Sequence, residues 1–421
     1  MEEQRMKTRD IAHITLEAET PFKIGSANSD FLKDSPIQRD WNGLPMILGT
    51  SIAGVLRKDF ESSLVEDIFG GQEFGSKAIF SNALLLDENQ KVHEELLLEK
   101  SSFLELFDTL PIREHTAITD KGVAKERSKF DEEVVYKGSR FKFSIEMLDD
   151  EEAFKKLIEL LQSPSFRLGG GSTKGFGKFK VIEIVTTKLS TIEELAEYSS
   201  SLNDKLINGC SVDLSTTVQA KNHTIYTLKI KPDDFFMFGS GFGDEDADQI
   251  PVYEQVVDYE LQGLSKKQIL FPASSIKGAL AHRTVYHYNL KEKLYIGNPE
   301  ARVAIPELFG EAKNSKKEID GSKGKVLFSD CFKLDRDEHK VFDHVAIDRF
   351  TGGGIDGALF QEKTIAQSDE WKIEILLENG VDEPFVKAFE QSLNDVCSGM
   401  LPLGGATTKG HGVFTGTWSK S

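Results

Sequence analysis

The sequence contains little cysteine, and this argues against two classes of small stabilised scaffold. Its three cysteines, Cys210, Cys331 and Cys397, lie far apart, and none belongs to a C-x-x-C pair. A zinc knuckle and a disulfide framework are therefore both poorly supported. Long apolar runs are also lacking, since none approaches the roughly 20 residues that span a bilayer. No apolar signal region follows Met1, so we expect a cytoplasmic protein with no membrane partner.

Positive charge is in deficit as well. The chain has 51 lysines and arginines against 69 aspartates and glutamates, a net charge of −18. This argues against a protein coated in positive charge, although net charge says nothing about local basic patches. With 39% hydrophobic and 29% charged residues, the composition is that of a globular protein. A length of 421 residues favours two domains over one.

Glycine is plentiful, and its 35 residues cluster in segments that occur twice. Residues 168–177 (LGGGSTKGFG) resemble residues 403–412 (LGGATTKGHG), 235 positions later. Four further pairs occur in the same order at offsets of 224 to 248: 51–56 with 275–280, 69–70 with 309–310, 79–81 with 327–329, and 115–118 with 344–347. The ordered set indicates a tandem duplication into two large copies rather than a solenoid of short repeats.

Hydrophobic periodicity gives each copy the order β-α-β-β-α-β. In the first copy we expect a strand over 11–19, a helix from Thr50 or Ser51, strands over 78–86 and 132–147, a helix over 150–162, and a strand over 177–186. In the second copy the same order covers 223–231, 274–288, 325–334, 360–378, 381–398 and 411–418. The predicted fold class is α+β, with two tandem ferredoxin-like domains enlarged by loop insertions. We assign residues 1–187 to the first domain, 188–220 to a helical linker, and 221–421 to the second domain.

The two glycine-rich loops have the chemistry of an anion site. Glycine allows backbone N–H groups to approach a ligand closely, and the neighbouring hydroxyls and lysines suit phosphates of a nucleic-acid backbone. The spacing of a Walker P-loop is absent. A tight turn with no ligand is the alternative interpretation of each loop.

These segments, taken together, resemble the RAMP superfamily of CRISPR-associated proteins. Residues 44–57 (LPMILGTSIAGVLR) and 271–280 (FPASSIKGAL) are similar to one family motif, and residues 344–353 (HVAIDRFTGG) to another. More narrowly, the chain resembles two fused copies of the backbone subunit of type III CRISPR effector complexes. The resemblance implies an RRM-like core in each copy, and a hairpin "thumb" that kinks the duplex of guide and target. It implies guide RNA (crRNA), complementary target RNA and neighbouring effector subunits as partners.

The resemblance also implies one catalytic acid in each copy. Residues 32–40 (LKDSPIQRD) match the family's catalytic loop, which makes Asp34 the candidate in the first copy. The second copy departs from the pattern, because residues 239–253 hold four acids but no D-S-P; Asp248 is closest by register and Asp246 is next. A carboxylate can act as a base or hold a divalent cation such as Mg²⁺ beside a phosphate, but the sequence assigns no metal ligands. The alternatives are an Asx turn at Asp34 and a solvated acidic loop in the second copy.

Candidate RNA contacts are the glycine loops and nearby hydroxyl, basic and aromatic residues. In the first copy they are Arg39, Ser51, Arg57, Gly170, Gly171, Ser172, Thr173, Lys174 and Lys178; in the second they are Ser275, Lys277, Arg283, Gly404, Gly405, Thr407, Thr408, Lys409 and His411. The expected thumbs, residues 113–130 and 343–360, contribute His115, Arg127, His344 and Arg349. Solvated loops and hydrogen-bonded structural histidines are the alternatives for the thumbs.

Three functions follow as hypotheses. The first is a metal-dependent endoribonuclease that cuts guide-paired target RNA, with one cut site in each domain. The second is a non-catalytic RNA-binding scaffold of the same complex. The third is an endoribonuclease that processes the guide precursor, which would require an acid–base histidine pair that the sequence does not clearly offer. The D-S-P context of Asp34 favours the first hypothesis.

Overall fold

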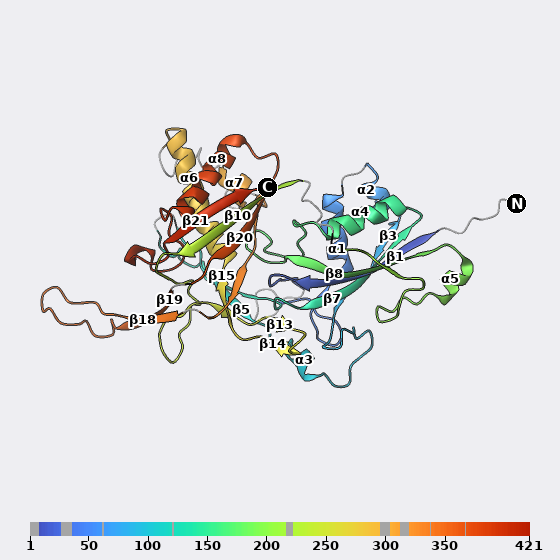
Figure 1. Ribbon diagram of the computed structural model, residues 1–421, viewed down its shortest axis with the longest axis horizontal. Helices are drawn as coiled ribbons and strands as arrows, with labels where there is room; N and C mark the ends of the chain where they lie inside the picture. The colour runs from blue at the N-terminus through green and yellow to red at the C-terminus, as the bar shows by residue number, and fades with distance from the viewer. Residues whose placement is uncertain are drawn as a thin grey trace.

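Each half of the chain pairs an antiparallel sheet with two long helices, as the computed structural model shows (Figure 1). The structure describes residues 8–26, 36–60, 63–119, 122–215, 222–294, 304–311, 320–336, 338–366 and 368–421. The fold is of the α+β class. Among these residues, no helix is both long and apolar enough to cross a membrane.

The sheet of the first copy is built around β1 (Arg9–Ala18). This strand pairs with β7 (Arg140–Leu148) on one side and β8 (Phe179–Leu189) on the other, so that Ile14 lies between Phe143 and Ile184. Beyond β7 lie β3 (Ala78–Phe80) and β4 (Ala83–Leu85), followed by β2 (Met46–Ile47). The outer edge next to β8 is β9 (Cys210–Ser211).

Two amphipathic helices contribute to the core of this first half. Helix α1 (Gly49–Asp59) buries Ile52 and Leu56, and α4 (Glu151–Leu161) buries Leu157 and Leu161 in the same cluster. The expected cap at Thr50 or Ser51 is wrong, because α1 already begins at Gly49. Its N-cap residue offers no side-chain bond, and the Gly49 N–H donates instead to Asn82 Oδ1 at 2.9 Å.

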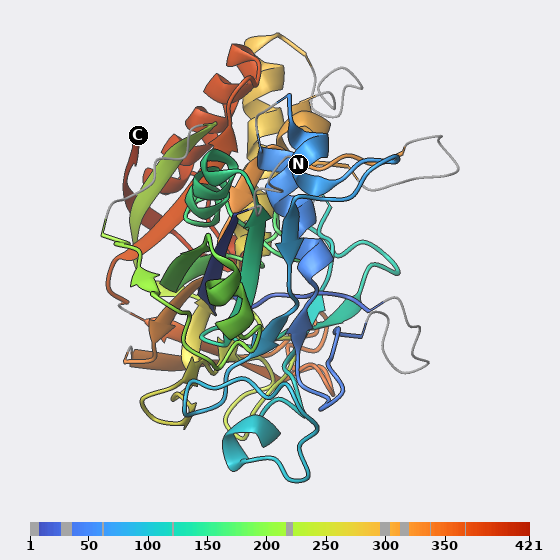
Figure 2. The ribbon, with the colours of Figure 1, turned by 90° about the vertical axis from the view of Figure 1, so that its right-hand side faces the viewer.

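The second sheet repeats this strand order. Its central strand β10 (His223–Pro232) pairs with β20 (Trp371–Glu378) and β21 (Phe414–Lys420), and β16 (Val326–Phe328) lies beyond β20. Helices α6 (Ala273–Lys291) and α8 (Glu383–Cys397) lie side by side, with Leu280 and Phe389 in a second core (Figure 2). The next strand after the first helix of each copy, β3 or β16, is therefore two positions away from the central strand of its sheet.

Two of the expected long strands are interrupted. The segment 132–147 is divided between β6 (Phe130–Glu133) and β7, with a turn in which Gly138 has a φ of 87°. Its counterpart 360–378 is divided between β19 (Phe360–Ala366) and β20. The first strand of each pair belongs to a hairpin: β5 (Ile112–His115) with β6, and β18 (Glu338–His344) with β19. These hairpins lie where the sequence places the thumbs, and the β18–β19 hairpin extends away from the body (Figure 1).

Short elements fill the connections. They are α2 (Val65–Phe69), α3 (Ser102–Glu105), α7 (Ala304–Phe309), β11 (Phe235–Phe236), β12 (Tyr253–Glu254), β13 (Val257–Asp258), β14 (Gly263–Leu264), β15 (Gln268–Phe271), β17 (Cys331–Leu334) and the 3-10 turn η3 (Thr407–Lys409). The linker expected to be helical over 188–220 contains the short helix α5 (Ile192–Glu197), and β9 then joins the first sheet. Val257 and Tyr259 pack in the core of the first half, so side chains cross between the halves. The proposed domain boundaries stay a prediction.

Candidate nucleic-acid interface

The two glycine loops have matching backbone anchors. The N–H of Gly170 donates to Lys23 O at 2.8 Å, and the N–H of Gly405 donates to Met237 O at 2.7 Å. Immediately before them, Gly169 and Gly404 have φ values of 87° and 95°. A Cβ there would lie 2.3 Å from Lys23 O or 2.4 Å from Met237 O. Glycine is required because each loop is held against the segment that follows the first strand of its copy.

Inside the loops the backbone bonds also repeat. Lys174 N–H donates to Gly171 O at 2.7 Å, and Lys409 N–H donates to Ala406 O at 2.8 Å. Gly171 and Ala406 both adopt the left-handed conformation, with φ values of 74° and 53°. Some of the N–H groups that the sequence offers to an anion are therefore used to close the turn. The tight-turn and anion-site interpretations are compatible, because the loop lysines and hydroxyls lie outside these bonds.

A matched aromatic and charged cluster lies at the base of each hairpin. In the first copy His115 stacks on Phe130 at 5.0 Å between ring centroids, and its Nε2 lies 3.2 Å from Glu132 Oε2. Lys174 of the glycine loop lies over Phe130, 5.1 Å from the ring centroid. Lys23 Nζ donates to Glu132 Oε1 at 3.1 Å. The contact with His115, together with Lys23 and Lys174, lowers the pKa of Glu132 to about 2 despite its burial.

The second copy reproduces this cluster. His344 stacks on Phe360 at 4.7 Å, and its Nε2 lies 3.1 Å from Glu362 Oε2. Lys409 lies over Phe360 at 5.0 Å and 3.7 Å from the Glu362 carboxylate. In both copies a carboxylate contacts the hairpin histidine close to the lysine of the glycine loop; Glu132 is half-buried and Glu362 is buried. The matched histidines pack in this cluster, and both their catalytic and their structural interpretations stay predictions.

The aromatic positions inside the glycine loops are buried. Phe176 is 1% exposed and lies under the guanidinium of Arg113, 4.9 Å from the ring centroid. His411 is 8% exposed and packs between Phe235 and Phe342. Neither ring is presented for stacking on a base in this conformation.

The first glycine loop forms part of the junction between the copies. Lys277 Nζ, from the second turn of α6, donates to Thr173 Oγ1 at 3.1 Å. Burial, together with the nearby Lys174, lowers the pKa of Lys277 to about 8. Gly175 pairs with Ser329, and a Cβ at Gly175 would lie 2.4 Å from Asp330 Oδ1. A hydroxyl and two ammonium groups of different copies therefore converge, which is suitable for one phosphate.

The second loop faces no such partner among the described residues. Thr408, Lys409 and Gly410 are exposed, and a Cβ added at Gly410 would meet no atom within 4 Å. Thr407 belongs to η3 and is half-buried. In the first loop, Ser172 is buried.

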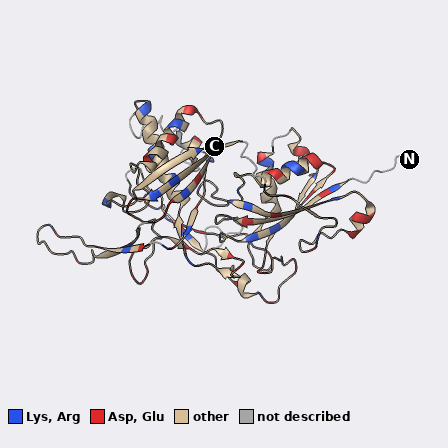
Figure 3. Cartoon of the chain, viewed as in Figure 1, with Lys and Arg blue, Asp and Glu red and all other residues tan. Residues whose placement is uncertain are grey.

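Several predicted RNA contacts already have partners within the chain. Arg39 Nη1 donates to Gly43 O at 2.7 Å and to Phe107 O at 2.8 Å. Arg57 Nη1 donates to Gly70 O, and Lys178 Nζ lies 3.0 Å from Glu374 of the second copy. Arg283 bonds Asp395 between α6 and α8. Ser51 is half-buried in α1, whereas Ser275 is exposed in α6. Lys and Arg alternate with Asp and Glu over both halves (Figure 3).

The acidic candidates differ in how far the structure describes them. Asp34 lies outside the described residues. In the second copy, Asp246 Oδ2 lies 3.0 Å from Lys363 Nζ, which also contacts Asp244 at 3.1 Å, and Asp248 Oδ2 accepts from the Gln361 N–H. Among the described residues, no group of three His, Cys, Asp or Glu side chains is arranged to hold a metal ion. The acidic loop of the second copy, residues 239–253, does not fit a divalent cation as it stands, because the Lys363 ammonium group contacts both Asp244 and Asp246.

The remaining thumb candidates are exposed in the hairpin loops. Arg127 has a φ of 52°, and Arg349 is next to Phe350, which is 99% exposed. Asp348 closes the turn there by accepting from the Thr351 N–H at 2.7 Å. Basic side chains on projecting hairpins are available for phosphate contacts.

Sequence reasoning missed the carboxylate clusters and the charged junction. Phe130 and Glu132 precede Phe360 and Glu362 by 230 positions, one more than the offset between His115 and His344. Extending the repeat search through the hairpins would have found both pairs. No comparable signal marks Arg113, which bonds Glu254 and Asp330 across the junction, because that contact depends on how the two copies pack.

Comparison with known proteins places the chain in a family. The RAMP superfamily matches residues 15–180 and 254–415, which together cover most of the chain. A solved structure described as "Cryo-EM structure of the Type III-B Cmr-beta bound to cognate target RNA" contains a chain with 19% sequence identity and a TM-score of 0.33; the match covers 43% of the present chain and 61% of that chain. The match thus spans about three fifths of that chain's length. A comparison with curated proteins finds no match. The chain belongs to the RAMP superfamily, and the family's domain occurs in it twice.

Proposed function

We propose that this protein is a guide-RNA-binding backbone subunit of a type III CRISPR effector complex, occupying two adjacent positions along the guide. Each copy would act as one ferredoxin-like (RRM-like) unit. Two observations support this arrangement: the element order β-α-β-β-α-β and the equivalent strand orders β8-β1-β7-β3 and β21-β10-β20-β16. Its partners would be crRNA, complementary target RNA and neighbouring effector subunits.

The repeated glycine loop carries the proposal. Both loops share their anchors to the first-strand segment, their left-handed residue and their lysine over a hairpin-base aromatic ring. Repetition of lysine, hydroxyl and glycine at a fixed offset suits a ligand that itself repeats, such as a phosphate backbone. In the first copy Lys277 and Thr173 extend the site across the junction.

Cleavage of the target strand is the finer part of the proposal, and Asp34 is its candidate residue. A carboxylate beside a kinked phosphodiester can remove the proton of the 2′-hydroxyl, and a positioned base contributes about 10²–10⁴-fold to the rate. The loop that follows Asp34 is well supported, because Asp40 accepts the N–H groups of Asn42 and Leu44 and Arg39 bonds two carbonyls. We retain a dependence on Mg²⁺ or another divalent cation as a prediction.

For the second copy a non-catalytic, RNA-ordering role is the second candidate. The observation that favours it is Lys363, whose ammonium group neutralises Asp244 and Asp246. Asp248 is likewise engaged, with the Gln361 N–H. A carboxylate with a strong cationic partner is a weaker base and a poorer cation ligand.

Mapping cuts in guide-matched RNA with the assembled complex tests the proposal. Variants Asp34→Asn and the pair Asp246→Asn/Asp248→Asn would be compared with Asp382→Asn, a control at the start of α8. We expect Asp34→Asn to remove one register of products, the second pair to leave the ladder unchanged if that copy only orders RNA, and chelation by EDTA to stop cleavage. An unchanged ladder with Asp34→Asn would refute the nuclease assignment. Failure of the wild-type complex to retain guide RNA would refute the RNA-binding role.

A further inference from the structure

Residues 94–99 form an exposed apolar ledge in the insertion between β4 and β5. Leu97 packs against the first core, whereas its neighbours Leu96 and Leu98 are 69% and 95% exposed. Single exposed leucines are common on protein surfaces, but two on one short segment require a closer explanation. Trp41, which directly precedes Asn42 in the sequence, is also 61% exposed.

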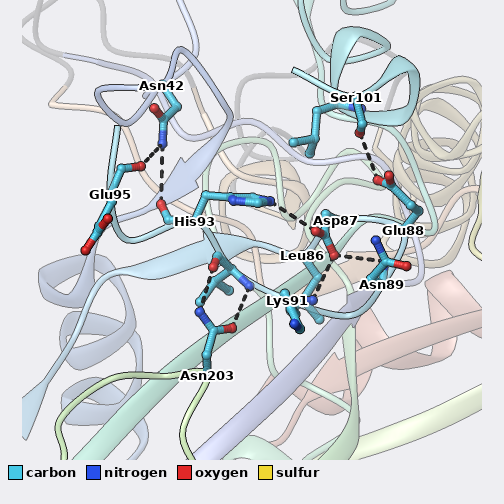
Figure 4. Close-up of polar contacts among 12 residues, drawn as sticks. Asn42, Leu86, Asp87, Glu88, Asn89, Lys91, His93, Glu95, Ser101 and Asn203 are labelled. Carbon is cyan, nitrogen blue, oxygen red and sulfur yellow. Dashed lines mark hydrogen bonds and ion pairs between the residues drawn. The ribbon is translucent and has the colours of Figure 1, made fainter. Parts of the chain in front are cut away.

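The ledge is held in place by side chains that bond its backbone (Figure 4). The Asn42 amide donates to Glu95 O at 3.0 Å and accepts from the Leu97 N–H at 2.8 Å. On the other side, Asn203 accepts from the Val92 N–H at 3.0 Å and donates to Val92 O at 2.8 Å. The conformation that exposes the two leucines is therefore built into the fold, and little ordering entropy remains to be lost on binding.

The base of the insertion is also fixed. Asp87 accepts from the N–H groups of Asn89 and Lys91 at 2.8 and 2.9 Å, and its other oxygen lies 3.0 Å from His93 Nε2. Glu94 accepts from the Leu202 N–H at 3.2 Å, which ties the ledge to the segment after α5. Between these two segments lies a groove of about 620 Å³, lined by residues 92–97, 199–201 and 203.

Charge identifies the kind of partner. Residues 87–108 contain seven acids (Asp87, Glu88, Glu94, Glu95, Glu99, Glu105, Asp108) and two lysines (Lys91, Lys100). Glu95 and Glu99 flank the leucines and are exposed, and one of the lysines, Lys100, pairs with Asp108. This charge repels an RNA backbone and a second equally acidic surface, but complements a basic protein surface.

We propose that residues 94–99 dock a different subunit of the effector complex, one that presents an apolar pocket surrounded by lysine or arginine. Leu96 and Leu98 enter the pocket, and Glu95 and Glu99 face its basic rim. The inference rests on the proposed function only in naming the complex as the source of the partner. The RNA-binding loops lie outside this surface, so the two roles are separable by mutation.

Co-expression of the tagged chain with the other subunits of the effector complex tests the inference. The variants are Leu96→Ser/Leu98→Ser and Glu95→Lys/Glu99→Lys, with Leu290→Ser, 63% exposed at the end of α6, as the matched control. Because the leucines are exposed, the variants should fold, and thermal unfolding checks this. We expect each double variant to weaken retention of one subunit by about tenfold or more, with guide-RNA binding unchanged.

A photo-reactive p-benzoylphenylalanine at position 98 identifies what covers the ledge in the assembled complex. We expect a cross-link to a basic segment of a different subunit. A cross-link to RNA or to a second copy of this chain, or no cross-link together with unchanged subunit retention, overturns the inference. If the wild-type chain retains no other subunit at all, the proposed function fails together with it. If the complex forms normally with every variant, only the docking inference fails.

Discussion

Removal of the Arg113 guanidinium should lower the free energy that couples the unfolding of the two copies. Arg113 extends from β5 of the first copy and is 8% exposed. Its Nη2 donates to Glu254 Oε2 at 2.8 Å, its Nε bonds the other Glu254 oxygen, and its Nη1 bonds Asp330. Burial alone would lower the pKa of Arg113, but the two carboxylates together raise it above its usual value.

The size of the effect follows from what Arg113→Met leaves behind. Methionine keeps much of the aliphatic volume, so the loss is mainly electrostatic. Two carboxylates then remain buried without a cation, and the side chain of Asp330 has no exposure at all. Breaking a buried ion pair from one side costs about 3–5 kcal/mol. We expect a loss of that size in the free energy that couples the copies.

Equilibrium unfolding in urea measures this loss. Trp41 reports on the first copy, whereas Trp371 and Trp418 report on the second. In the wild type we expect one cooperative transition for all three probes. In Arg113→Met we expect separate transitions, because the junction no longer couples the copies. A shift of less than about 1 kcal/mol, within the usual range of a surface pair, would refute the reasoning.

A second variant, Asp330→Asn, follows from the residue at the corresponding position of the first copy, Asn82. Asn82 Oδ1 accepts from the Gly49 N–H at 2.9 Å, just as Asp330 Oδ1 accepts from the Ala273 N–H at 2.8 Å. Asp330→Asn should therefore keep the helix contact while removing the charge. In the Arg113→Met background we expect it to restore about 1–3 kcal/mol, although alone it destabilises. Strict additivity of the two changes would show that the residues are not coupled.

Four further predictions concern single residues. Ala406→Gly should raise stability by about 1 kcal/mol, measured as a higher Tm, because Ala406 adopts a φ of 53°; an unchanged or lower Tm would contradict this. Gly175→Ala should destabilise more than Gly410→Ala, since both glycines have positive φ but only at Gly175 would a Cβ meet side chains of the other copy, those of Ala273 and Asp330; equal Tm losses would show that the junction is not packed this way. Burial and the nearby Lys142 lower the pKa of His13 to about 4, so protonation favours the unfolded chain, and stability present above pH 6.5 is lost as the pH falls towards 4. From pH 7 to pH 5 this amounts to about 2 kcal/mol in urea unfolding, a loss that His13→Leu should lack. Lys277, with a pKa of about 8, loses its charge above that pH, so RNA affinity in a filter-binding titration should fall about tenfold between pH 7 and pH 9, and Lys277→Met should remove this dependence.

The regular elements were accessible from sequence because apolar periodicity and turn residues agree there. The strand over 11–19, the helix over 150–162 and the helix over 381–398 correspond closely to β1, α4 and α8. The strands over 132–147 and 360–378 were expected without their breaks, because the alternating pattern continues from hairpin to sheet. In the first copy, the segment between β6 and β7 contains the turn at Gly138, where a Cβ would lie 2.1 Å from Val257 O.

The charged site residues were harder to predict, because a basic side chain has the same appearance in sequence whether or not it has a partner. Lys178 and Arg283 were expected at RNA, and the fold gives them Glu374 and Asp395 as partners. Lys277 was expected at RNA and lies at the glycine loop of the other copy. Such contacts join residues more than 100 positions apart, so neither periodicity nor motif spacing encodes them.

The residues that join the two copies differ between the copies. The first copy's Arg113 corresponds to Phe342 in the second, at the offset that relates His115 to His344. The second copy's Asp330 corresponds to Asn82, and its Lys277 to Ala53. A second chain stacked in the same way would therefore place Phe342 against Asn82, without the buried cation and its carboxylates. Because that ion cluster is complete only inside one chain, the junction favours the fused pair over a polymer of identical chains, and the outer faces are left to partners of different chemistry.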